Sequence, residues 1–290
     1  MFFRINCALC NRAVPFGKCK RIRVSSICVI RDTIIRRLVF VKPRKEKWRC
    51  CVSDRNSIEF KVTARHALFT DPITRIGGEK CSYHLPTYEA LKGIAKSIYW
   101  KPTFIWIIDG VRVLKPIRTQ TKGIKPLKMG GGNTLAIYTF LQDVAYQVKA
   151  HFEWNPHHAE LAEDRIEGKH YNIARRVLAL GGRQDIFLGT RDCQGYVEPC
   201  EYGSGQGYYD GQGELAYGLM FHGFDYPDET GLPELQARLW FPTMRDGYVT
   251  FPRPESCSVR KFIRKMAAKK FGKANVCGVT REEENLGVVA

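Results

Sequence analysis

Residues 57–102 constrain the fold most, because they read as a strand, a glycine-containing loop and a helix in close succession. Apolar and polar residues alternate over 58–62, the pattern of a half-buried strand. The pair Gly77-Gly78 then breaks the chain into a loop. Apolar residues recur at helical spacing over 88–98, and Thr87 is placed to cap this helix. The segment is therefore predicted to form one strand–loop–helix unit.

The segments that follow extend this unit into a larger pattern. Apolar runs at 103–108 and 111–114 flank Asp109-Gly110, which is a strong hairpin signal. A strand is predicted at 146–154, a helix at 169–180 and a short strand at 186–188. This order approximates the βαββαβ pattern of a ferredoxin-like (RRM-like) domain, so the predicted fold class is α+β. Further strands at 214–224, 235–241 and 247–251 predict a small C-terminal antiparallel β region, followed by a basic helix near 258–270.

Four parts are predicted along the chain: an N-terminal extension at 1–56, a ferredoxin-like domain at 57–203, a C-terminal β region with its basic helix at 204–270, and a tail at 271–290. The extension carries 15 Lys or Arg, 3 Asp or Glu, and 6 of the 11 cysteines. Cys7 and Cys10 form a CxxC, but a second close pair is missing, which disfavours zinc. A second functional alternative for the extension is a basic arm that binds phosphates. The favoured interpretation is a disordered extension or upstream sequence translated from a start codon placed too early.

The charge of the chain favours a polyanionic partner. The formal net charge is +17, of which residues 57–290 carry only +5, so affinity for a polyanion would depend on clustered charge. No apolar run approaches the roughly 18 residues that a membrane span needs, and no secretory signal is evident. The cysteines are therefore predicted to be reduced thiols in a cytoplasmic protein without a membrane partner.

Two segments are candidates for contact with a nucleic acid. Residues 119–134 read as a long basic loop with Gly130-Gly131-Gly132, whose backbone amides could approach phosphates or serve as a flexible connection. The loop at 203–213 mixes glycines with aromatic rings, on which unpaired bases can stack, although a plain glycine-rich hairpin fits as well. The predicted RNA-binding residues are Lys122, Lys125, Lys128, Tyr208 and Tyr209.

The candidate catalytic group is the pair Lys169-His170 together with Tyr99 at the end of the first helix. Cleavage of RNA without a metal needs a base for the 2′-hydroxyl, an acid for the leaving 5′-oxygen, and a cation for the phosphorane. Histidine can be acid or base, lysine the cation, and a tyrosine hydroxyl can relay a proton. On the residues alone, a Lys-His pair at a helix start is more often a surface feature.

Metal chemistry is not expected from the sequence. His157, His158 and Glu160 read as a solvated turn, because no partner cluster stands at ligand spacing. No acidic cluster of the two-metal nuclease kind is evident, which argues against metal-dependent DNA cleavage. The sequence therefore predicts neither a metal site nor a cofactor.

Four segments together carry a resemblance to a known family: residues 57–102, MGGGNT at 129–134, DRIEGKHY at 164–171, and the run at 185–213. The chain resembles the fifth Cas family of CRISPR-associated proteins in its Dvulg branch, found in subtype I-C systems, over about residues 57–270. The resemblance implies a ferredoxin-like domain of the RAMP superfamily and a smaller C-terminal β region. It also implies that Tyr99, Lys169 and His170 form the catalytic set.

The function that this resemblance implies is a metal-independent endoribonuclease. We expect it to cut CRISPR precursor RNA at the base of the repeat hairpin by 2′-hydroxyl transesterification, leaving a 2′,3′-cyclic phosphate and a 5′-hydroxyl. It would then remain on the 5′ handle of the guide RNA, beside the backbone and large subunits of the Cascade interference complex. The alternative is a non-catalytic RNA-binding subunit that caps the 5′ handle, and the intact Tyr99, Lys169 and His170 favour the enzyme.

Overall fold

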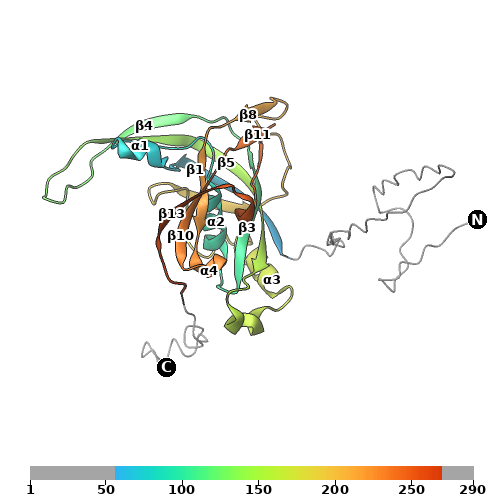
Figure 1. Cartoon of the computed structure of the whole chain (residues 1–290). Coiled ribbons are helices and arrows are strands. Elements are labelled where there is room, and N and C mark those ends of the chain that lie inside the picture. Colours follow the sequence, from blue (N-terminus) through green and yellow to red (C-terminus); the bar gives the residue numbers. More distant parts are fainter. Residues whose placement is uncertain (1–55, 270–290) are drawn as a thin grey trace, which may run out of the picture. The chain divides into compact units, whose positions relative to one another are not determined.

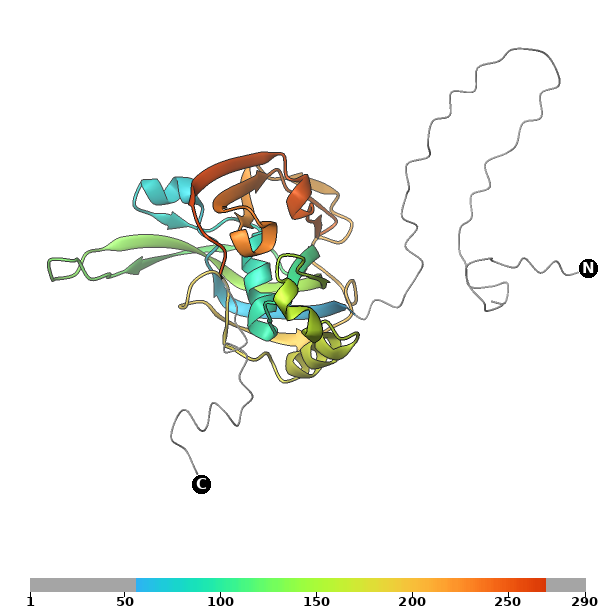
Figure 2. The same ribbon diagram turned by 60° about the horizontal axis from the view of Figure 1, so that its bottom comes forward.

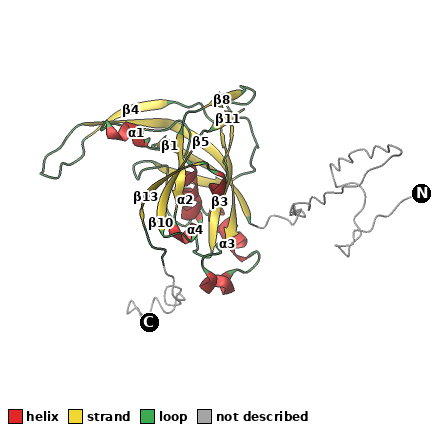
Figure 3. Cartoon of the chain, in the orientation of Figure 1, coloured by secondary structure: helices red, strands yellow, loops and turns green. Residues whose placement is uncertain are grey.

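The computed structural model of the chain describes residues 56–269, in which more residues lie in strands than in helices (Figure 3). The predicted N-terminal extension with its Cys7-Cys10 pair, and the predicted tail, lie outside the described residues. Within the described range, no helix is long and apolar enough to cross a membrane.

The strand–loop–helix unit predicted at 57–102 is confirmed. Strand β1 (Ser57–Ala67) buries every second side chain along its first half. The loop holds the short helix α1 (Pro72–Ile76) and strand β2 (Lys80–Cys81). Helix α2 (Tyr88–Ile98) begins after Thr87, whose side chain accepts a hydrogen bond of 3.2 Å from the Ala90 amide. This cap satisfies one of the free amides of the first turn.

The hairpin predicted at Asp109-Gly110 is wrong, because β3 (Phe104–Val113) runs straight through it. The pairing register with the neighbouring strand shifts between Ile108 and Gly110, so the dipeptide forms a β-bulge. Gly110 is needed there for a different reason: a Cβ at this position would lie 3.0 Å from the Val249 carbonyl oxygen. The glycine lets another strand approach closely and does not turn the chain.

The basic loop predicted at 119–134 is in part a strand. Strand β4 (Thr119–Ile124) pairs antiparallel with the first residues of β5 (Ala136–Trp154), and residues 125–135 connect them. β4 has no apolar alternation, so its pairing depends on the much longer β5. The short β2 pairs with Tyr138 and Thr139 of β5, and beyond it the tip of the β4–β5 hairpin extends away from the other strands (Figures 1 and 2).

A mostly antiparallel sheet forms the main body of this mixed α/β protein. Its central strands lie in the order β7-β1-β5-β3, and each neighbouring pair is antiparallel. β7 (Gln194–Pro199) also pairs with the short β6 (Ile186–Phe187). The other side of the sheet continues from β3 through β12 (Tyr248–Thr250), β11 (Thr243–Arg245) and β8 (Glu214–Ala216).

Two helices pack on this sheet and enclose the core. Helix α2 contacts β3, and α3 (Lys169–Ala179) contacts β7 and β1. Buried side chains of the sheet, such as Phe60 and Trp106, meet buried side chains of the helices, such as Leu91 and Leu178. A 3₁₀ helix, η1 (Ala159–Asp164), precedes α3.

The C-terminal β region predicted at 204–270 is divided between two sheets: β8, β11 and β12 extend the first sheet, and a second sheet has the strand order β13-β10-β9. It contains β9 (Met220–Asp225), β10 (Glu234–Trp240) and β13 (Val259–Lys265), with the short helices α4 (Pro227–Thr230) and η2 (Pro254–Ser256). The strand predicted at 214–224 is divided, because β8 joins the first sheet and β9 the second. The strands predicted at 235–241 and 247–251 are confirmed as β10 and β12.

The basic helix predicted at 258–270 is wrong, since residues 259–265 form strand β13. Val259, Phe262 and Ile263 fall at helical spacing, which explains the prediction. The free edge of β10 offers backbone partners along the whole segment, and antiparallel pairing with β10 prevails over this local pattern.

Candidate active site

Tyr99 is held in place by the end of α2. Its amide donates to the Ala95 carbonyl at 3.1 Å, and its own carbonyl accepts from the Trp106 indole at 2.7 Å. The side chain is 3% exposed. These contacts fix the phenol on the side where α3 begins.

His170 is the second residue of α3 and is 1% exposed. Its ring lies among the rings of Phe104, Phe152 and Trp154. The Tyr99 hydroxyl and His170 Nδ1 are 2.9 Å apart, so the structure brings together two residues that are 71 positions apart in the sequence.

The hydrogen-bond partners of His170 fix its tautomer. Nε2 faces the Asp164 carbonyl oxygen at 2.8 Å and the Asp164 carboxylate at 3.3 Å. Both partners only accept, so Nε2 carries a hydrogen and donates it. In the neutral ring Nδ1 is then an acceptor, and the Tyr99 hydroxyl donates to it. The imidazole is therefore set to receive a proton from the side of Tyr99.

Asp164, the last residue of η1, contacts two of the predicted catalytic residues, Lys169 and His170. Its carboxylate accepts hydrogen bonds from Lys169 Nζ at 2.5 Å and from the Thr103 hydroxyl at 2.8 Å. Burial works against ionisation, but the hydrogen bonds from Lys169 and Thr103 outweigh it and hold the pKa of Asp164 below its usual range. Burial, and then the charge of Asp164, raise the pKa of the Tyr99 phenol to about 12.

Sequence reasoning missed Asp164 and Thr103. Asp164 opens the string DRIEGKHY, so its proximity to Lys169 was a signal that could have been used. Thr103 gave no such signal, because only the fold brings the residue before β3 to the end of η1.

The four polar residues differ in their access to solvent. The side chain of Lys169 is 40% exposed and that of Asp164 is 30% exposed, whereas His170 is covered. A phosphate that approaches from solvent therefore meets Lys169 and Asp164 before it can meet the imidazole.

The predicted RNA-binding lysines lie on the β4–β5 hairpin, apart from this group. Lys125 and Lys128 are exposed in the connection 125–135. Lys122 is only partly exposed; its ammonium lies 2.7 Å from His66 Nε2 and 5.7 Å from the centre of the Phe140 ring. Lys125 and Lys128 are thus the more available of the three for an external phosphate.

The two predicted stacking tyrosines have opposite environments. Tyr208 is 55% exposed, whereas Tyr209 is 8% exposed and its hydroxyl accepts from the Ile117 amide at 2.9 Å. Tyr209 is therefore part of the core, and stacking on a base would require it to leave that core. Arg112 donates to the carbonyls of Ser204 and Gly205, which ties the glycine-rich loop to β3.

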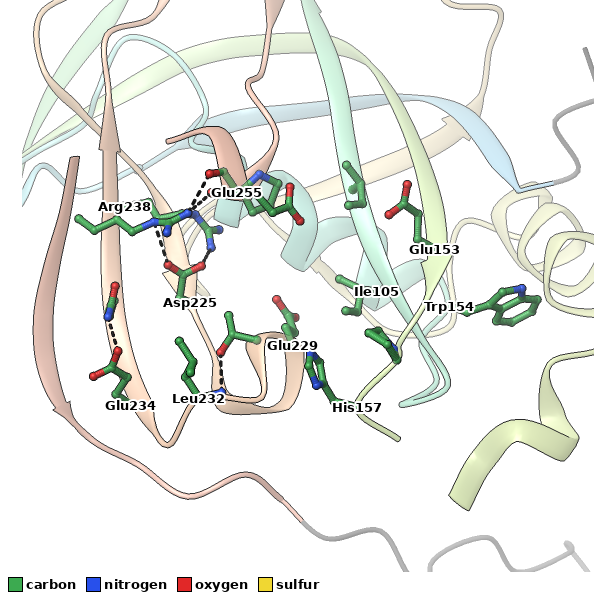
Figure 4. A pocket seen from close by; sticks show the side chains of 16 residues that line it. Ile105, Glu153, Trp154, His157, Asp225, Glu229, Leu232, Glu234, Arg238 and Glu255 are labelled. Carbon is green, nitrogen blue, oxygen red and sulfur yellow. Dashed lines mark hydrogen bonds and ion pairs between the residues drawn. The ribbon is translucent and has the colours of Figure 1, made fainter. Parts of the chain in front are cut away.

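A separate cavity of about 550 Å³ is lined by Ile105 and Ile107 of β3 and by residues of the second sheet (Figure 4). Several carboxylates line it, and two of them have cationic partners: Asp225 pairs with Arg238, and Glu229 pairs with Lys92. No group of three potential metal ligands is found among residues 56–269. His158 and Glu160 do contact each other, at 2.8 Å.

The sequence matches a known family over most of its described length. The sequence model of the family described as "CRISPR-associated protein (Cas_Cas5)", in its Cas5d version, matches residues 57–252. The chain therefore belongs to the Cas5 family of CRISPR-associated proteins, in the Cas5d group.

Two curated relatives have the same name, CRISPR pre-crRNA endoribonuclease Cas5d. The protein from Thermus thermophilus is 27% identical over 187 residues, which cover 61% of this chain and 77% of the relative. The protein from Mannheimia succiniciproducens is 32% identical over 162 residues, which cover 47% of this chain and 69% of the relative.

Solved structures agree with this assignment. A crystal structure of a CRISPR-associated protein superimposes with a TM-score of 0.61 at 34% identity, covering 71% of this chain and 96% of that one. A functionally uncharacterized protein from Streptococcus mutans superimposes with a TM-score of 0.59 at 35% identity, with the same coverage.

Proposed function

We propose that this protein is a metal-independent endoribonuclease that cuts CRISPR precursor RNA at the base of the repeat hairpin. The names of its two relatives support cleavage of this RNA. The observation that carries the proposal is the connected group of Tyr99, His170, Asp164 and Lys169. It supplies a proton acceptor, a proton relay and a cation within one set of contacts.

The proposed reaction is attack of the 2′-hydroxyl on the adjacent phosphate. His170 Nδ1 takes up the proton, and the Tyr99 hydroxyl passes it between RNA and imidazole. The high pKa of Tyr99 means that its phenolate is not populated near neutral pH, so it relays a proton and does not store a negative charge. Lys169 stabilises the charge that develops on the phosphorane. As the bond between phosphorus and the 2′-oxygen forms, the bond to the 5′-oxygen breaks, and the imidazolium returns the proton through Tyr99 to the leaving 5′-oxygen. The products are therefore a 2′,3′-cyclic phosphate and a 5′-hydroxyl.

The fold that we propose for residues 57–203 is ferredoxin-like, of the RAMP superfamily. Three features support it: the strand order β7-β1-β5-β3, the antiparallel pairing of each neighbouring pair, and the places of α2 and α3 along the chain. In that pattern α2 connects β1 to β3, and α3 connects β5 to β7, which is the βαββαβ order.

We further propose that the protein stays on the 5′ handle of the guide RNA, beside the backbone and large subunits of the Cascade complex. The exposed Lys125 and Lys128 support a contact between the β4–β5 hairpin and RNA. Tyr208 is exposed enough to stack on an unpaired base.

One observation favours a second candidate function. His170 is 1% exposed and both of its ring nitrogens already have partners. A protein that kept this arrangement on RNA would bind the 5′ handle without cutting it. Cleavage requires the segment around Asp164 to move, so the two candidates differ in what happens to His170 when RNA binds.

The deciding experiment incubates the purified protein with its own repeat RNA in EDTA. We expect cleavage in EDTA, and none when the nucleotide before the cut carries a 2′-deoxy sugar. His170→Ala should slow cleavage by about 10² to 10⁴, the range of a general acid or base. The matched control is His157→Ala, because His157 is exposed and not in contact with Tyr99, Asp164 or Lys169 in the described structure. Binding without cleavage by the wild-type protein would favour the second candidate.

A further inference from the structure

Three hydrogen-bond donors converge on the carboxylate of Asp164. Lys169 Nζ lies 2.5 Å and the Thr103 hydroxyl 2.8 Å from its oxygens, and His170 Nε2 lies 3.3 Å from one of them. The donors come from three places: the residue before β3, the first residue of α3 and the second residue of α3. Their common feature is that each points a hydrogen at one anionic group.

The same donors suit a phosphate. A phosphate offers anionic oxygens that accept charge-assisted hydrogen bonds, as a carboxylate does. The amino end of an α-helix attracts anions, and α3 begins here with Gly168 at its N-cap. Thr103 is 1% exposed, and its hydroxyl donates a hydrogen bond to the Asp164 carboxylate. A buried hydroxyl of this kind has a defined position for one acceptor.

We propose that the Asp164 carboxylate occupies the position that the scissile phosphate takes when RNA binds, and that Thr103 is a third donor of that phosphate site beside Lys169 and His170. This inference rests on the proposed function, because it names the site at which the RNA phosphate replaces Asp164. The exchange substitutes one anion for another, so Lys169 is not left without a counter-charge in either state. The buried Thr103 hydroxyl also keeps an acceptor in both states, and leaving it without one would be costly.

The local structure permits the exchange. Among the described residues of η1 none is buried, so moving this helix exposes little apolar surface. Gly168, between η1 and α3, has a φ of 73°, a left-handed conformation that glycine adopts readily and that makes it a natural hinge. The Asp164 carbonyl also holds His170 Nε2, so residue 164 moves as a whole and frees the imidazole.

The test titrates the RNA-free protein with inorganic phosphate and follows the imidazole signals of His170 by NMR. Asp164→Asn removes the competing charge and keeps the shape of the side chain. We expect it to bind phosphate at least about tenfold more tightly than the wild type, because the phosphate no longer competes with a carboxylate for charge-assisted hydrogen bonds. Asp143→Asn is the matched control: it removes a carboxylate from an exposed pair with Lys115 and should leave phosphate affinity unchanged.

Thr103 provides the second arm. In the Asp164→Asn background, Thr103→Val should weaken phosphate binding by about tenfold, and Thr103→Ser should restore it. Equal phosphate affinity of Asp164→Asn and the wild type would overturn the proposal, and so would an Asp164→Asn/Thr103→Val protein that binds as tightly as Asp164→Asn.

A further measurement keeps the proposal testable if Asp164→Asn does not fold. Thr103→Val alone should lower the single-turnover cleavage rate at saturating protein by about tenfold, with less than about a twofold change in the protein concentration that gives half the maximal rate. An unchanged saturating rate would overturn the proposal. The phosphate titration contains no RNA, so a protein that binds phosphate as expected but cuts no RNA would refute the proposed function and leave the anion site standing.

Discussion

Replacing Lys125 and Lys128 with glutamine tests whether the β4–β5 hairpin contacts the RNA backbone. Each lysine that neutralises a phosphate releases counterions and contributes about 0.7 to 0.9 to the slope of log K against log salt. Both side chains are exposed, so the double substitution should flatten the slope by about 1.4 to 1.8. Adding Lys122→Gln should change it by less than about 0.5, because this ammonium is already engaged by His66 and Phe140.

The assay is fluorescence anisotropy with a labelled repeat hairpin between about 50 and 200 mM salt. The RNA carries the 2′-deoxy nucleotide, so that binding is measured without cleavage. Lys115→Gln is the control, because Lys115 is exposed but paired with Asp143 at 2.6 Å. An unchanged slope for the double substitution would remove the hairpin from the interface. If Lys122→Gln changed the salt slope as much as either of the other two substitutions, its contacts with His66 and Phe140 would not keep Lys122 from binding a phosphate.

The remaining predictions concern stability. Burial, with the charges of Arg238 and Lys92, lowers the pKa of His222 to about 3. The unfolded chain therefore binds a proton below about pH 6.5 that the folded protein does not, and the folded state loses stability as pH falls. Between pH 7 and pH 5 the loss in unfolding free energy should be about 2 kcal/mol smaller for His222→Phe than for the wild type, by urea unfolding. Gly189→Ala should cost at least about 3 kcal/mol, because φ is 95° and a Cβ would lie 1.9 Å from the Leu68 carbonyl oxygen. Gly211→Ala, with φ 74° and open space in the described structure, should cost only about 1 kcal/mol; equal losses would contradict the steric argument.

The sequence predicted correctly those elements whose signal is local. The alternation in β1 and the cap and spacing of α2 are properties of neighbouring residues, and both elements formed as expected. The predictions failed where a distant strand decides. Asp109-Gly110 has the composition of a turn, yet β5 pairs on both sides of it. Residues 259–265 have helical spacing, yet β10 pairs with them as a strand.

The candidate site shows the same division. Tyr99 and His170 were expected to act together, and the fold places them in hydrogen-bond contact. Burial of His170 was not expected, because it results from three aromatic rings that come from β3 and β5. No sequence pattern could predict a role for Thr103, because only the folded chain brings its hydroxyl to the Asp164 carboxylate.

The length of β5 limits how such a protein can change over evolutionary time. Its 19 residues span about 60 Å, at about 3.3 Å per residue, from the hairpin to the rings around His170. Insertion of one residue would turn every following side chain to the opposite face, and so would exchange core for surface along β1 and β3. Selection should therefore tolerate insertions and deletions in the connection 125–135, which is mostly exposed, and reject them within β5. Related proteins should therefore differ in length at the tip of the β4–β5 hairpin, while β5 behind it keeps its length.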